Sequence, residues 1–464
     1  MTQDPRQAAE TKMREAGAHE EAIRAFLSAF DRLESGESAL LPSSELEPAG
    51  DVPGLEELQA ADEAAALEHL AIIKLNGGLA TTMGLRSPKS LVQARDGHSF
   101  LDIIIGQTLA LRARHDVRLP LVLMDSEATQ EETLRALQSH PDLDAGLPLD
   151  FLQSMVPKLE AEGLAPAQWP QAPALEWCPP GHGDVYGALR RSGLLEQLLA
   201  QGFHHSMISN SDNLGATVDP RIAAHMAAEQ IPFLMEVVQG TEADRKGGHI
   251  ARRREDGQLV LRESAQTPDE DADSFRDYRR WRYYNTNNLW VDLRVLSERL
   301  EDGGGVLELP LIINRKTVDP RDSDSTPVLQ LESAMGAAIA SFPGAQLLLV
   351  PRTRFVPVKT TDDLLVLRSD VYTVTDDMLV APRPERAQSL PFVALDSRYY
   401  KLLDEFEQRF AHGAPSLREA QRLVVEGDIT FGEGVVVRGV ADLHATEPQE
   451  LPAGTTIGSD PEPA

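Results

Sequence analysis

The chain of 464 residues contains a single cysteine, and this scarcity excludes several kinds of chemistry. With Cys178 alone, an internal disulfide and a zinc site built on several thiolates are both impossible. No apolar run approaches the length of a membrane span, and residues 1–7 lack the basic and apolar regions of a secretory signal. We therefore expect a cytoplasmic protein that does not enter a membrane.

Basic residues are also scarce relative to acidic ones. The chain has 44 lysines and arginines against 73 aspartates and glutamates, which gives a net charge of −29. This balance argues against binding to nucleic acid or to anionic membranes. Any phosphate site must therefore be built from local cations and main-chain dipoles. With 42% hydrophobic residues the composition is that of a soluble globular protein, and the length allows more than one domain.

The most informative segment is a glycine-rich loop that follows a strand-like apolar run at Leu70–Leu75. Gly77, Gly78 and Gly84 allow the main chain to approach a ligand, and free N–H groups in such a loop bind anions. Two threonines within the loop and Lys89 beyond it can complete a phosphate site. The spacing fits neither the P-loop nor the dinucleotide-binding motif. A tight turn that binds no ligand is the alternative for the loop taken alone.

Between about residues 69 and 390, strand-like runs alternate with helical stretches. This alternation predicts an α/β fold with a mainly parallel sheet and helices on both faces. Ligands of such sheets bind beyond the carboxyl ends of the strands, where the loop 76–84 and the turn Ser209–Asp212 would both lie. The predicted strands are Leu119–Met124, Ser206–Ser209, Phe233–Val238 and Gln346–Val350, and the predicted helices include Phe100–Arg114, Gln130–Ser139 and Val185–Ala200.

The two ends of the chain differ from this central region. Residues 8–34 have the apolar spacing of an amphipathic helix or a pair of helices, and the Pro- and Glu-rich residues 42–54 are typical of a linker. Apolar residues at six-residue intervals within 421–440 weakly indicate a parallel β-helix, with a short meander of strands as the alternative. The last residues, rich in Pro, Glu, Gly and Asp, are expected to be disordered.

Six segments in a fixed order resemble one family of enzymes. The loop reads Lys-Leu-Asn-Gly-Gly-Leu-Ala-Thr-Thr-Met-Gly, and it resembles the signature of the eukaryotic-type UTP–glucose-1-phosphate uridylyltransferases, also called UDP-glucose pyrophosphorylases. Any one of the segments could arise by chance, but all six in order make a specific match. They are Lys74–Ser90, Trp177–Asp184, Ser209–Asp219, Lys246–Gly248, Asn285–Trp290 and Val356–Leu364.

The resemblance implies both an architecture and a reaction. The architecture is an N-terminal helical segment and linker (1–68), a catalytic domain with a mixed, mainly parallel, Rossmann-like nucleotidyltransferase sheet (69–390), and a C-terminal helix with a small β-helix (391–464). The implied reaction joins UTP and glucose 1-phosphate into UDP-glucose and pyrophosphate with the help of Mg²⁺ as cofactor. The attacking phosphate oxygen is already anionic, so no general base is needed, and positioning and electrostatic stabilisation carry the transfer. A homo-oligomer is also compatible with the resemblance.

The same resemblance assigns residues to the nucleotide. Lys89 and Lys359 would face the phosphates as the catalytic cations, although a lysine such as Lys89 taken alone is more often a surface residue. The remaining nucleotide-binding residues would be Leu75, Asn76, Gly77, Gly78, Gln153 and Gly181.

Four further residues are assigned to the sugar phosphate and the metal. Asp212, at a predicted strand end, would bind Mg²⁺, which needs only one or two protein carboxylates. His182, Lys246 and Asn288 would bind the sugar phosphate. On spacing alone, Asp212 would more often be a turn residue, His182 a solvated histidine and Asn288 part of a turn.

Several positions depart from the family pattern. Ala80 and Ser87 replace glycines, Leu152 replaces an asparagine, and Cys178 stands where a tyrosine is common. An alanine at position 80 would be strained if the backbone there requires a positive φ. The departures leave the predicted catalytic positions intact and bear on affinity and sugar selectivity. Two other functions stay open, a pyrophosphorylase for another or for several sugar 1-phosphates and a non-catalytic nucleotide-sugar sensor.

Overall fold

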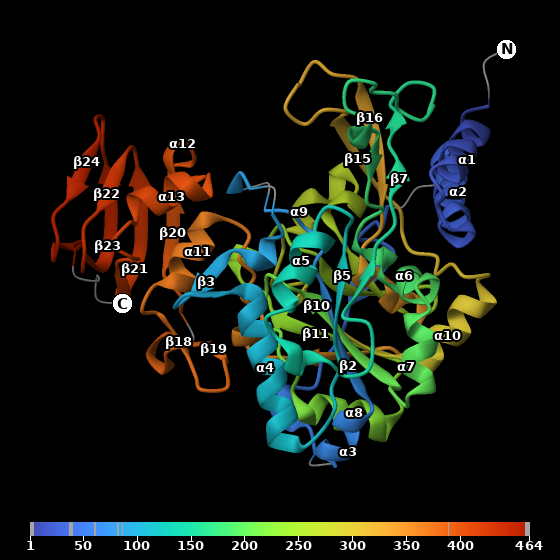
Figure 1. The fold of residues 1–464 in the computed structure, drawn as a ribbon, viewed down its shortest axis with the longest axis horizontal. Coiled ribbons are helices and arrows are strands. Elements are labelled where there is room, and N and C mark those ends of the chain that lie inside the picture. Colours follow the sequence, from blue (N-terminus) through green and yellow to red (C-terminus); the bar gives the residue numbers. More distant parts are fainter. Residues whose placement is uncertain are drawn as a thin grey trace.

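A ten-stranded mixed sheet forms the centre of the computed structural model, which describes residues 4–36, 40–59, 62–80, 83–85, 87–387 and 389–459 (Figure 1). The predicted disorder of the last residues concerns 460–464 in part, and these lie outside the described residues. The strands are β1 (Leu46–Pro48), β2 (Leu70–Leu75), β5 (Leu121–Asp125), β6 (Asp150–Leu152), β10 (His205–Asn210), β11 (Phe233–Gln239), β12 (His249–Arg253), β13 (Leu259–Arg262), β14 (Tyr283–Asp292) and β17 (Gln346–Leu349).

Parallel pairing is confined to part of this sheet. Strands β10, β2, β5 and β6 lie side by side in parallel, and β11 pairs in parallel with β17. Strand β14 runs antiparallel to β10, β11 and β12, and β12 also pairs antiparallel with β13. The sheet is therefore mixed, and the prediction that it is mainly parallel was too strong.

Helices cover both faces of the sheet, as the alternating pattern predicts. Along β2, Ile72 faces one apolar core while Ala71 and Ile73 face another, since side chains alternate along a strand. The first core includes residues of α3 (Glu63–Glu68), α4 (Phe100–His115), α5 (Gln130–Leu137) and α8 (Pro220–Glu229). The second includes residues of α6 (Val185–Arg191), α7 (Leu194–Ala200) and α10 (Leu293–Asp302).

Two local expectations are corrected by the structure. The single helix expected over Val185–Ala200 is broken into α6 and α7 by Gly193, whose φ of 72° is incompatible with a continuing helix. The expected linker at 42–54 contains β1, in which buried Leu46 pairs with Arg253 of β12. The N-terminal helices are confirmed as a pair, α1 (Pro5–Glu15) and α2 (Glu20–Glu34).

The C-terminal strands pair in parallel. Their order is β20 (Phe392–Leu395), β21 (Ser416–Glu426), β23 (Val436–His444) and β25 (Thr456–Ile457), while β22 (Ile429–Phe431) pairs with β24 (Gln449–Leu451). The residues that recur at six-residue intervals, Leu423, Ile429 and Val435, are all buried in one core. Parallel pairing is not that of a meander, whose strands are antiparallel. Helices α12 (Ser397–Tyr400) and α13 (Leu403–Arg409) lie beside these strands in Figure 1.

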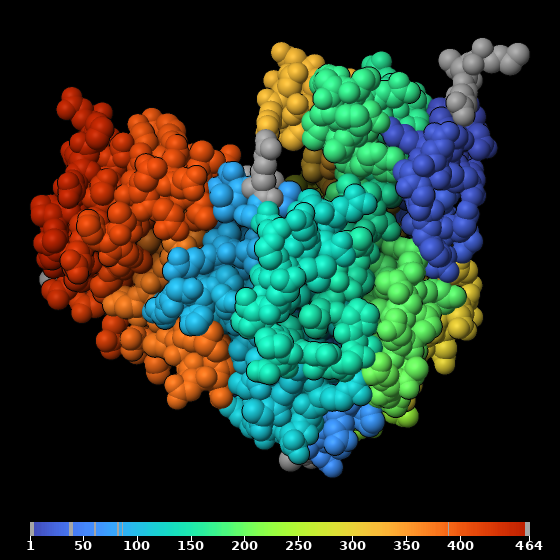
Figure 2. All heavy atoms as spheres, viewed as in Figure 1, coloured from blue at the N-terminus to red at the C-terminus, as the bar shows by residue number. Residues whose placement is uncertain are grey.

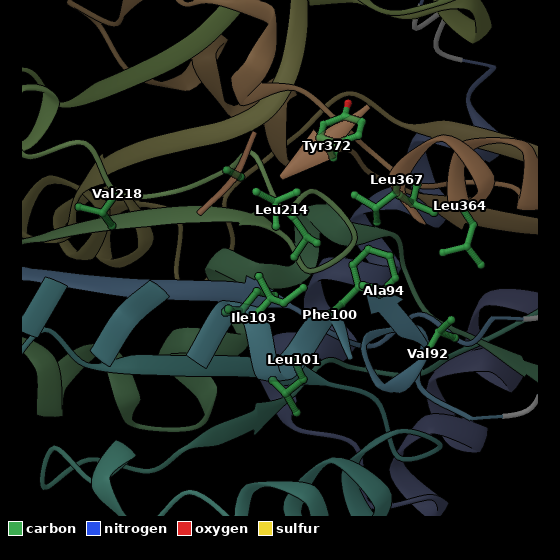
Figure 3. Packing of buried hydrophobic residues seen from close by; sticks show 14 of the residues in the cluster. Val92, Ala94, Phe100, Leu101, Ile103, Leu214, Val218, Leu364, Leu367 and Tyr372 are labelled. Carbon is green, nitrogen blue, oxygen red and sulfur yellow. The ribbon is translucent and has the colours of Figure 1, made fainter. Parts of the chain in front are cut away.

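One apolar cluster packs α4 against α11 (Thr361–Arg368), as Figure 3 shows. Phe100 at the start of α4 lies in the same cluster as Val92 and as Leu364 and Leu367 of α11. Val92 ends the short 3-10 turn that begins at Lys89, and α11 begins two residues after Lys359. The cluster therefore supports both chain segments that carry the predicted catalytic lysines.

Candidate active site

The candidate site lies where four parallel strands end. Asn76 to Gly78 follow β2, Ser126 follows β5, Gln153 follows β6, and Ser211 and Asp212 follow β10. Strand β2 has β5 on one side and β10 on the other, and the chain reaches these neighbours in opposite directions. Such a reversal opens a crevice beyond the carboxyl ends of the strands, where α/β proteins bind their ligands.

A cavity of about 250 Å³ occupies this position. The space-filling view shows the surface hollowed between the segment that carries β15 (Ile312–Thr317) and β16 (Pro327–Glu332) and the main body (Figure 2). Eight of the predicted site residues line the cavity together with four that were not predicted. The lining residues are Leu75, Gly77, Gly78, Lys89, Met124, Gln153, Pro179, Gly181, His182, Asn210, Ser211 and Asp212.

Lys89 and Asp212 form an ion pair in the wall of this cavity. The Lys89 Nζ donates to Asp212 Oδ2 at 2.7 Å, and the two side chains are only 16% and 18% exposed. The other carboxylate oxygen, Asp212 Oδ1, is buried and has no hydrogen-bond partner. A buried carboxylate oxygen without a donor suits a cation, so Asp212 fits the role of a single Mg²⁺ ligand. Within the described ranges, no group of three or more His, Cys, Asp or Glu side chains could hold a metal by itself.

The glycine loop is shaped by Gln153. A β-carbon at Gly77 would lie 2.7 Å from Gln153 Nε2, whereas a β-carbon at Gly78 would meet nothing within 4 Å. Gly77 is therefore required for the Gln153 amide to lie over the loop. The Ser126 hydroxyl donates to the Gly77 carbonyl at 3.0 Å and holds the loop from the side of β5. The two threonines of this loop, Thr81 and Thr82, lie outside the described residues.

His182 contributes a neutral ring to the cavity. Its Nδ1 accepts a hydrogen bond from the Met335 N–H at 3.0 Å, and burial lowers the pKa of His182 to about 4. A neutral imidazole that accepts at Nδ1 carries its proton on Nε2, so His182 can donate to a ligand at physiological pH. Gly181 has a φ of 81°, and a β-carbon there would lie 2.7 Å from the Ser333 backbone nitrogen. This position therefore requires glycine even without a bound ligand.

The Asn76 side chain points away from the cavity. Its Nδ2 donates to Asp125 Oδ1 at 2.8 Å and to the Thr133 hydroxyl at 3.0 Å, and it is buried. Burial raises the pKa of Asp125 to about 6, although the Thr129 hydroxyl and Asn76 stabilise the carboxylate by hydrogen bonding. Asn76 therefore supports the loop from behind, and the predicted contact with the nucleotide would have to come from its main chain.

Lys359 and Lys246 do not line the cavity, and both are exposed. The N–H of Val358 donates to the Asp212 carbonyl at 3.1 Å, so Lys359 follows a residue that is bonded to the turn that carries Asp212. Burial raises the pKa of the Glu263 carboxyl group, and the charge of Lys359 nearby acts in the opposite direction. Glu263 also fills the space that a β-carbon at Gly248 would need. Sequence reasoning missed Glu263, because a single glutamate after a strand carries no signal.

Asn288 is placed beneath the cavity rather than in its wall. Its Nδ2 donates to Glu236 Oε2 at 3.1 Å and to the Arg354 carbonyl at 3.2 Å, and its side chain is fully buried. Both of these acceptors belong to the protein, so this amide nitrogen has no hydrogen left for a sugar hydroxyl in this arrangement. Binding of glucose by Asn288 stays a prediction that the geometry does not favour.

A second residue that sequence reasoning missed is Lys74, which lies in the strand before the loop. Its Nζ donates to the Ser209 hydroxyl at 2.8 Å and to the Ala216 carbonyl at 2.7 Å, and burial lowers the pKa of Lys74 to about 7. It links the ends of β2 and β10 beneath Asp212. A lysine inside the apolar run Leu70–Leu75 was the available signal.

The departures from the family pattern prove mild in structural terms. Ala80 is buried and has no positive φ, so the strain that an alanine there could introduce is absent. Leu152 is 38% exposed at the end of β6, next to Gln153. Cys178 is buried, and burial raises the pKa of its thiol to about 12, which makes it unreactive.

A parallel-strand crevice with a glycine loop, a lysine–aspartate pair and a neutral histidine defines a nucleotidyltransferase of the α/β class. The sequence model of the UTP–glucose-1-phosphate uridylyltransferase family matches residues 23–438. The chain belongs to this family.

Individual relatives agree with this assignment. The chain is 38% identical over 427 residues to the UTP–glucose-1-phosphate uridylyltransferase of Solanum tuberosum, covering 91% of this chain and 86% of that protein. Among solved structures, the UDP-glucose pyrophosphorylase of Leishmania major, known in open and closed forms, superposes with a TM-score of 0.91 at 42% identity and covers 98% of both chains. The UDP-glucose phosphorylase of Trypanosoma brucei superposes with a TM-score of 0.90 at 41% identity, covering 99% of this chain and 98% of that one.

Proposed function

We propose that this protein is an enzyme that makes UDP-glucose and pyrophosphate from UTP and glucose 1-phosphate. The observation that carries the proposal is the Lys89–Asp212 pair at the carboxyl edge of the parallel strands, with one buried Asp212 oxygen lacking a partner. Membership of the uridylyltransferase family and similarity to a Leishmania major structure solved in complex with UDP-glucose support the same substrates.

The reaction exchanges one phosphorus–oxygen bond for another. A phosphate oxygen of glucose 1-phosphate attacks the α-phosphorus of UTP, and the bond from that phosphorus to the β-phosphate bridge breaks to release pyrophosphate. The attacking oxygen is already anionic, so the protein needs no general base. Its task is to bring two anions together in line and to stabilise the charge that passes to the leaving group.

The nucleotide would occupy the cavity between β2 and β10. Gln153, held over Gly77, can offer its amide to the uracil edge, and main-chain groups of the loop can reach the ribose and phosphates. Lys89 would turn from Asp212 to the triphosphate or bridge both, since the two anions are close together. Gly181 and Leu75 both line the cavity, and the base would pack against them.

Mg²⁺ is part of the proposal, with Asp212 as its protein ligand. Asp212 Oδ1 is the fitting atom because it is buried and has no donor. When bound, the ion would neutralise charge on the phosphates and help to orient them. Waters and phosphate oxygens would complete its coordination, as is usual for Mg²⁺.

The sugar phosphate would lie between His182 and Lys359. The Nε2–H of His182 can donate to a phosphate oxygen without carrying a charge, and the Lys359 ammonium can stabilise the reacting phosphates. Glu263 can accept hydrogen bonds from sugar hydroxyls on the side of Lys359. Lys246 is exposed and does not line the cavity, so it would contribute only a long-range attraction.

The proposal extends to five features that concern the whole protein. We propose a cytoplasmic enzyme without a nucleic acid partner, a possible homo-oligomer, the domain limits 1–68, 69–390 and 391–464, and a β-helix for the parallel C-terminal strands. The high negative charge supports the absence of nucleic acid binding. No described helix is both long enough and apolar enough to cross a membrane.

Pyrophosphate release from UTP, glucose 1-phosphate and Mg²⁺ tests the proposal. The purified chain should release pyrophosphate and form UDP-glucose in equal amounts, and Asp212→Asn should remove most of this activity. Galactose 1-phosphate and N-acetylglucosamine 1-phosphate are the controls for sugar selectivity. Binding of UDP-glucose without any turnover would favour a sensor, and faster turnover of another sugar phosphate would change the substrate.

A further inference from the structure

The segment that carries Lys359 has no strand ladder to hold it. After the 3-10 turn Arg352–Arg354, residues 355–360 have no helical or strand structure apart from a single bridge between Pro357 and Asn213. The position of Lys359 relative to the Lys89–Asp212 pair therefore depends on contacts of individual side chains and main-chain groups.

Asp363 Oδ2 accepts from the N–H groups of Lys359 and Thr360, at 2.7 Å and 2.9 Å. On the side of the turn that carries Asp212, the side-chain contacts come from Asn213. Its Oδ1 accepts from the Val356 N–H at 2.9 Å, and its Nδ2 donates to the Arg354 carbonyl at 3.1 Å and to Asn288 Oδ1 at 3.3 Å. One residue earlier, the Asp212 carbonyl accepts from the Val358 N–H at 3.1 Å. The Asn213 amide thus uses both of its ends to fasten the Lys359 segment to the turn that carries Asp212.

A buried ion pair fixes the other side of this arrangement. The Arg354 guanidinium donates to both oxygens of Glu236, at 2.8 Å and 2.6 Å, and Glu236 also accepts from Asn288 Nδ2 and, at 2.9 Å, from Trp290 Nε1. Glu236 is fully buried and Arg354 nearly so. A buried pair often adds little net stability over apolar packing, because desolvation of the charges offsets their attraction. The pair nevertheless holds the side chain of Arg354, whose carbonyl is the acceptor for Asn213 and Asn288.

We infer that Asn213, supported by Asn288 and the Glu236–Arg354 pair, is a positioning residue that sets the distance between Lys359 and the Lys89–Asp212 pair. This inference rests on the proposed uridylyl transfer. It gives Asn288 a role that does not require contact with glucose. Because a displacement of about 1 Å can cost roughly a hundredfold in rate, a contact of this kind affects turnover without touching a substrate.

The test is a double-mutant cycle between Asn213→Ala and Lys359→Ala. Asn213→Ala should lower kcat roughly a hundredfold while the KM values of both substrates stay within about threefold, since the loss concerns the position of Lys359. In the Lys359→Ala background the same substitution should lower kcat by no more than about threefold, because the group that it positions is absent. Asn314→Ala, on β15 outside this network, is the matched control and should keep the kcat of the unsubstituted enzyme.

Two other results would overturn the inference. The first is a kcat for Asn213→Ala close to that of the unsubstituted enzyme. The second is a loss of the same size with and without Lys359, which would mark a general structural role. If Asn213→Ala fails to fold, as judged by circular dichroism, Asn288→Ala enters the same cycle, and an increase in the KM for glucose 1-phosphate with unchanged kcat would instead support sugar binding by Asn288. If the unsubstituted chain has no activity, the proposed function is wrong. This result differs from failure of the inference, in which the unsubstituted chain is active.

Discussion

The main sheet and the C-terminal strands both contain parallel pairs, yet they are organised differently. In the C-terminal sheet, β20, β21, β23 and β25 follow one another in chain order, whereas β2 of the main sheet lies between β5 and β10. A sheet whose strands all advance in one direction has no reversal, and a reversal is what opens a crevice at the carboxyl edge. The comparison shows that parallel pairing alone does not create a ligand-binding crevice. The crevice depends on the order of the strands in the sheet.

The buried residues of the two regions differ accordingly. Strand β21 buries Leu417, Ala420 and Leu423 in an apolar core. The main sheet buries Lys74 on β2 and Glu236 on β11, each with hydrogen-bond partners. Burying charge is costly unless it is paired, so such residues are retained where they serve chemistry or positioning. Substitutions in the main sheet should therefore affect turnover, and those in the C-terminal strands should affect stability.

The largest expected effect is on the catalytic side of the comparison. Lys359→Ala should lower kcat roughly a hundredfold to a thousandfold, because it removes a charge that stabilises the transferring phosphates. Lys359 is exposed, so the midpoint of thermal unfolding should change little. Steady-state assays of pyrophosphate release, with Lys401→Ala as an exposed control near the C-terminal strands, measure the effect. Near-normal turnover would remove the assignment of Lys359.

A pH effect is expected from Asp125 behind the glycine loop. Burial raises the pKa of Asp125 from 3.8 to about 6, so the folded state holds the proton more tightly than the unfolded state. The favourable contribution is present below pH 4 and is lost as the pH rises through 6, at a cost of about 3 kcal/mol. From pH 4 to pH 7, the free energy of unfolding of the unsubstituted protein should therefore fall relative to that of Asp125→Asn.

Urea unfolding at several pH values measures this difference. Asp142→Asn, at an exposed aspartate, is the control and should show no comparable change with pH. A difference for Asp125→Asn that does not vary with pH would contradict the buried, proton-holding state of this carboxyl group.

The stability side of the comparison is tested at Gly427, between β21 and β22. Its φ of 101° is in the left-handed region, and a β-carbon there would collide with the Ala445 carbonyl oxygen. Gly427→Ala should lower the free energy of unfolding by roughly 1 to 3 kcal/mol while kcat stays unchanged. Gly434→Ala, where φ is 68° and nothing lies within 4 Å, should cost only about 1 kcal/mol. Loss of turnover in the folded Gly427 variant would show that the two regions are coupled.

The smallest effect is expected in the glycine loop. Gly77→Ala should displace the Gln153 amide and raise the KM for UTP roughly fivefold to tenfold, since one hydrogen bond contributes about 1 kcal/mol. Gly78→Ala should have a smaller effect, because its β-carbon would meet no protein atom within 4 Å. Initial rates at varied UTP concentration separate the two variants. Equal effects would mean that the nucleotide itself, rather than Gln153, requires both glycines.

Much of the lining of the candidate active-site cavity was predictable from local sequence. Gly77, Lys89, His182 and Asp212 lie in short motifs, and each follows or opens a regular element close to it in the chain. Helices and strands follow from apolar periodicity, which is also local. The break at Gly193 shows the limit of this reasoning, because a single glycine is compatible with a helix until its φ is known.

The hydrogen-bond partners of the asparagine side chains were not predictable in the same way. The Asn76 amide donates to Asp125, and the Asn288 amide donates to Glu236, which lies 52 residues away in the chain. Both asparagines could equally have faced a ligand, since an amide group donates and accepts in any polar setting. Only the strand order decides which neighbours are within reach, and no single-chain pattern encodes that order.

The amino-acid sequence alone determined the family, the glycine loop and the residue types that can bind phosphates, because these depend on local spacing and on side-chain chemistry. The tertiary structure alone decided that β14 runs antiparallel to its neighbours in the main sheet, that Lys89 pairs with Asp212 across 123 residues, and that Asn213 fastens the segment of Lys359. The physical reason is that hydrogen bonds and ion pairs depend on distances of about 3 Å, which only the packing of distant elements can set.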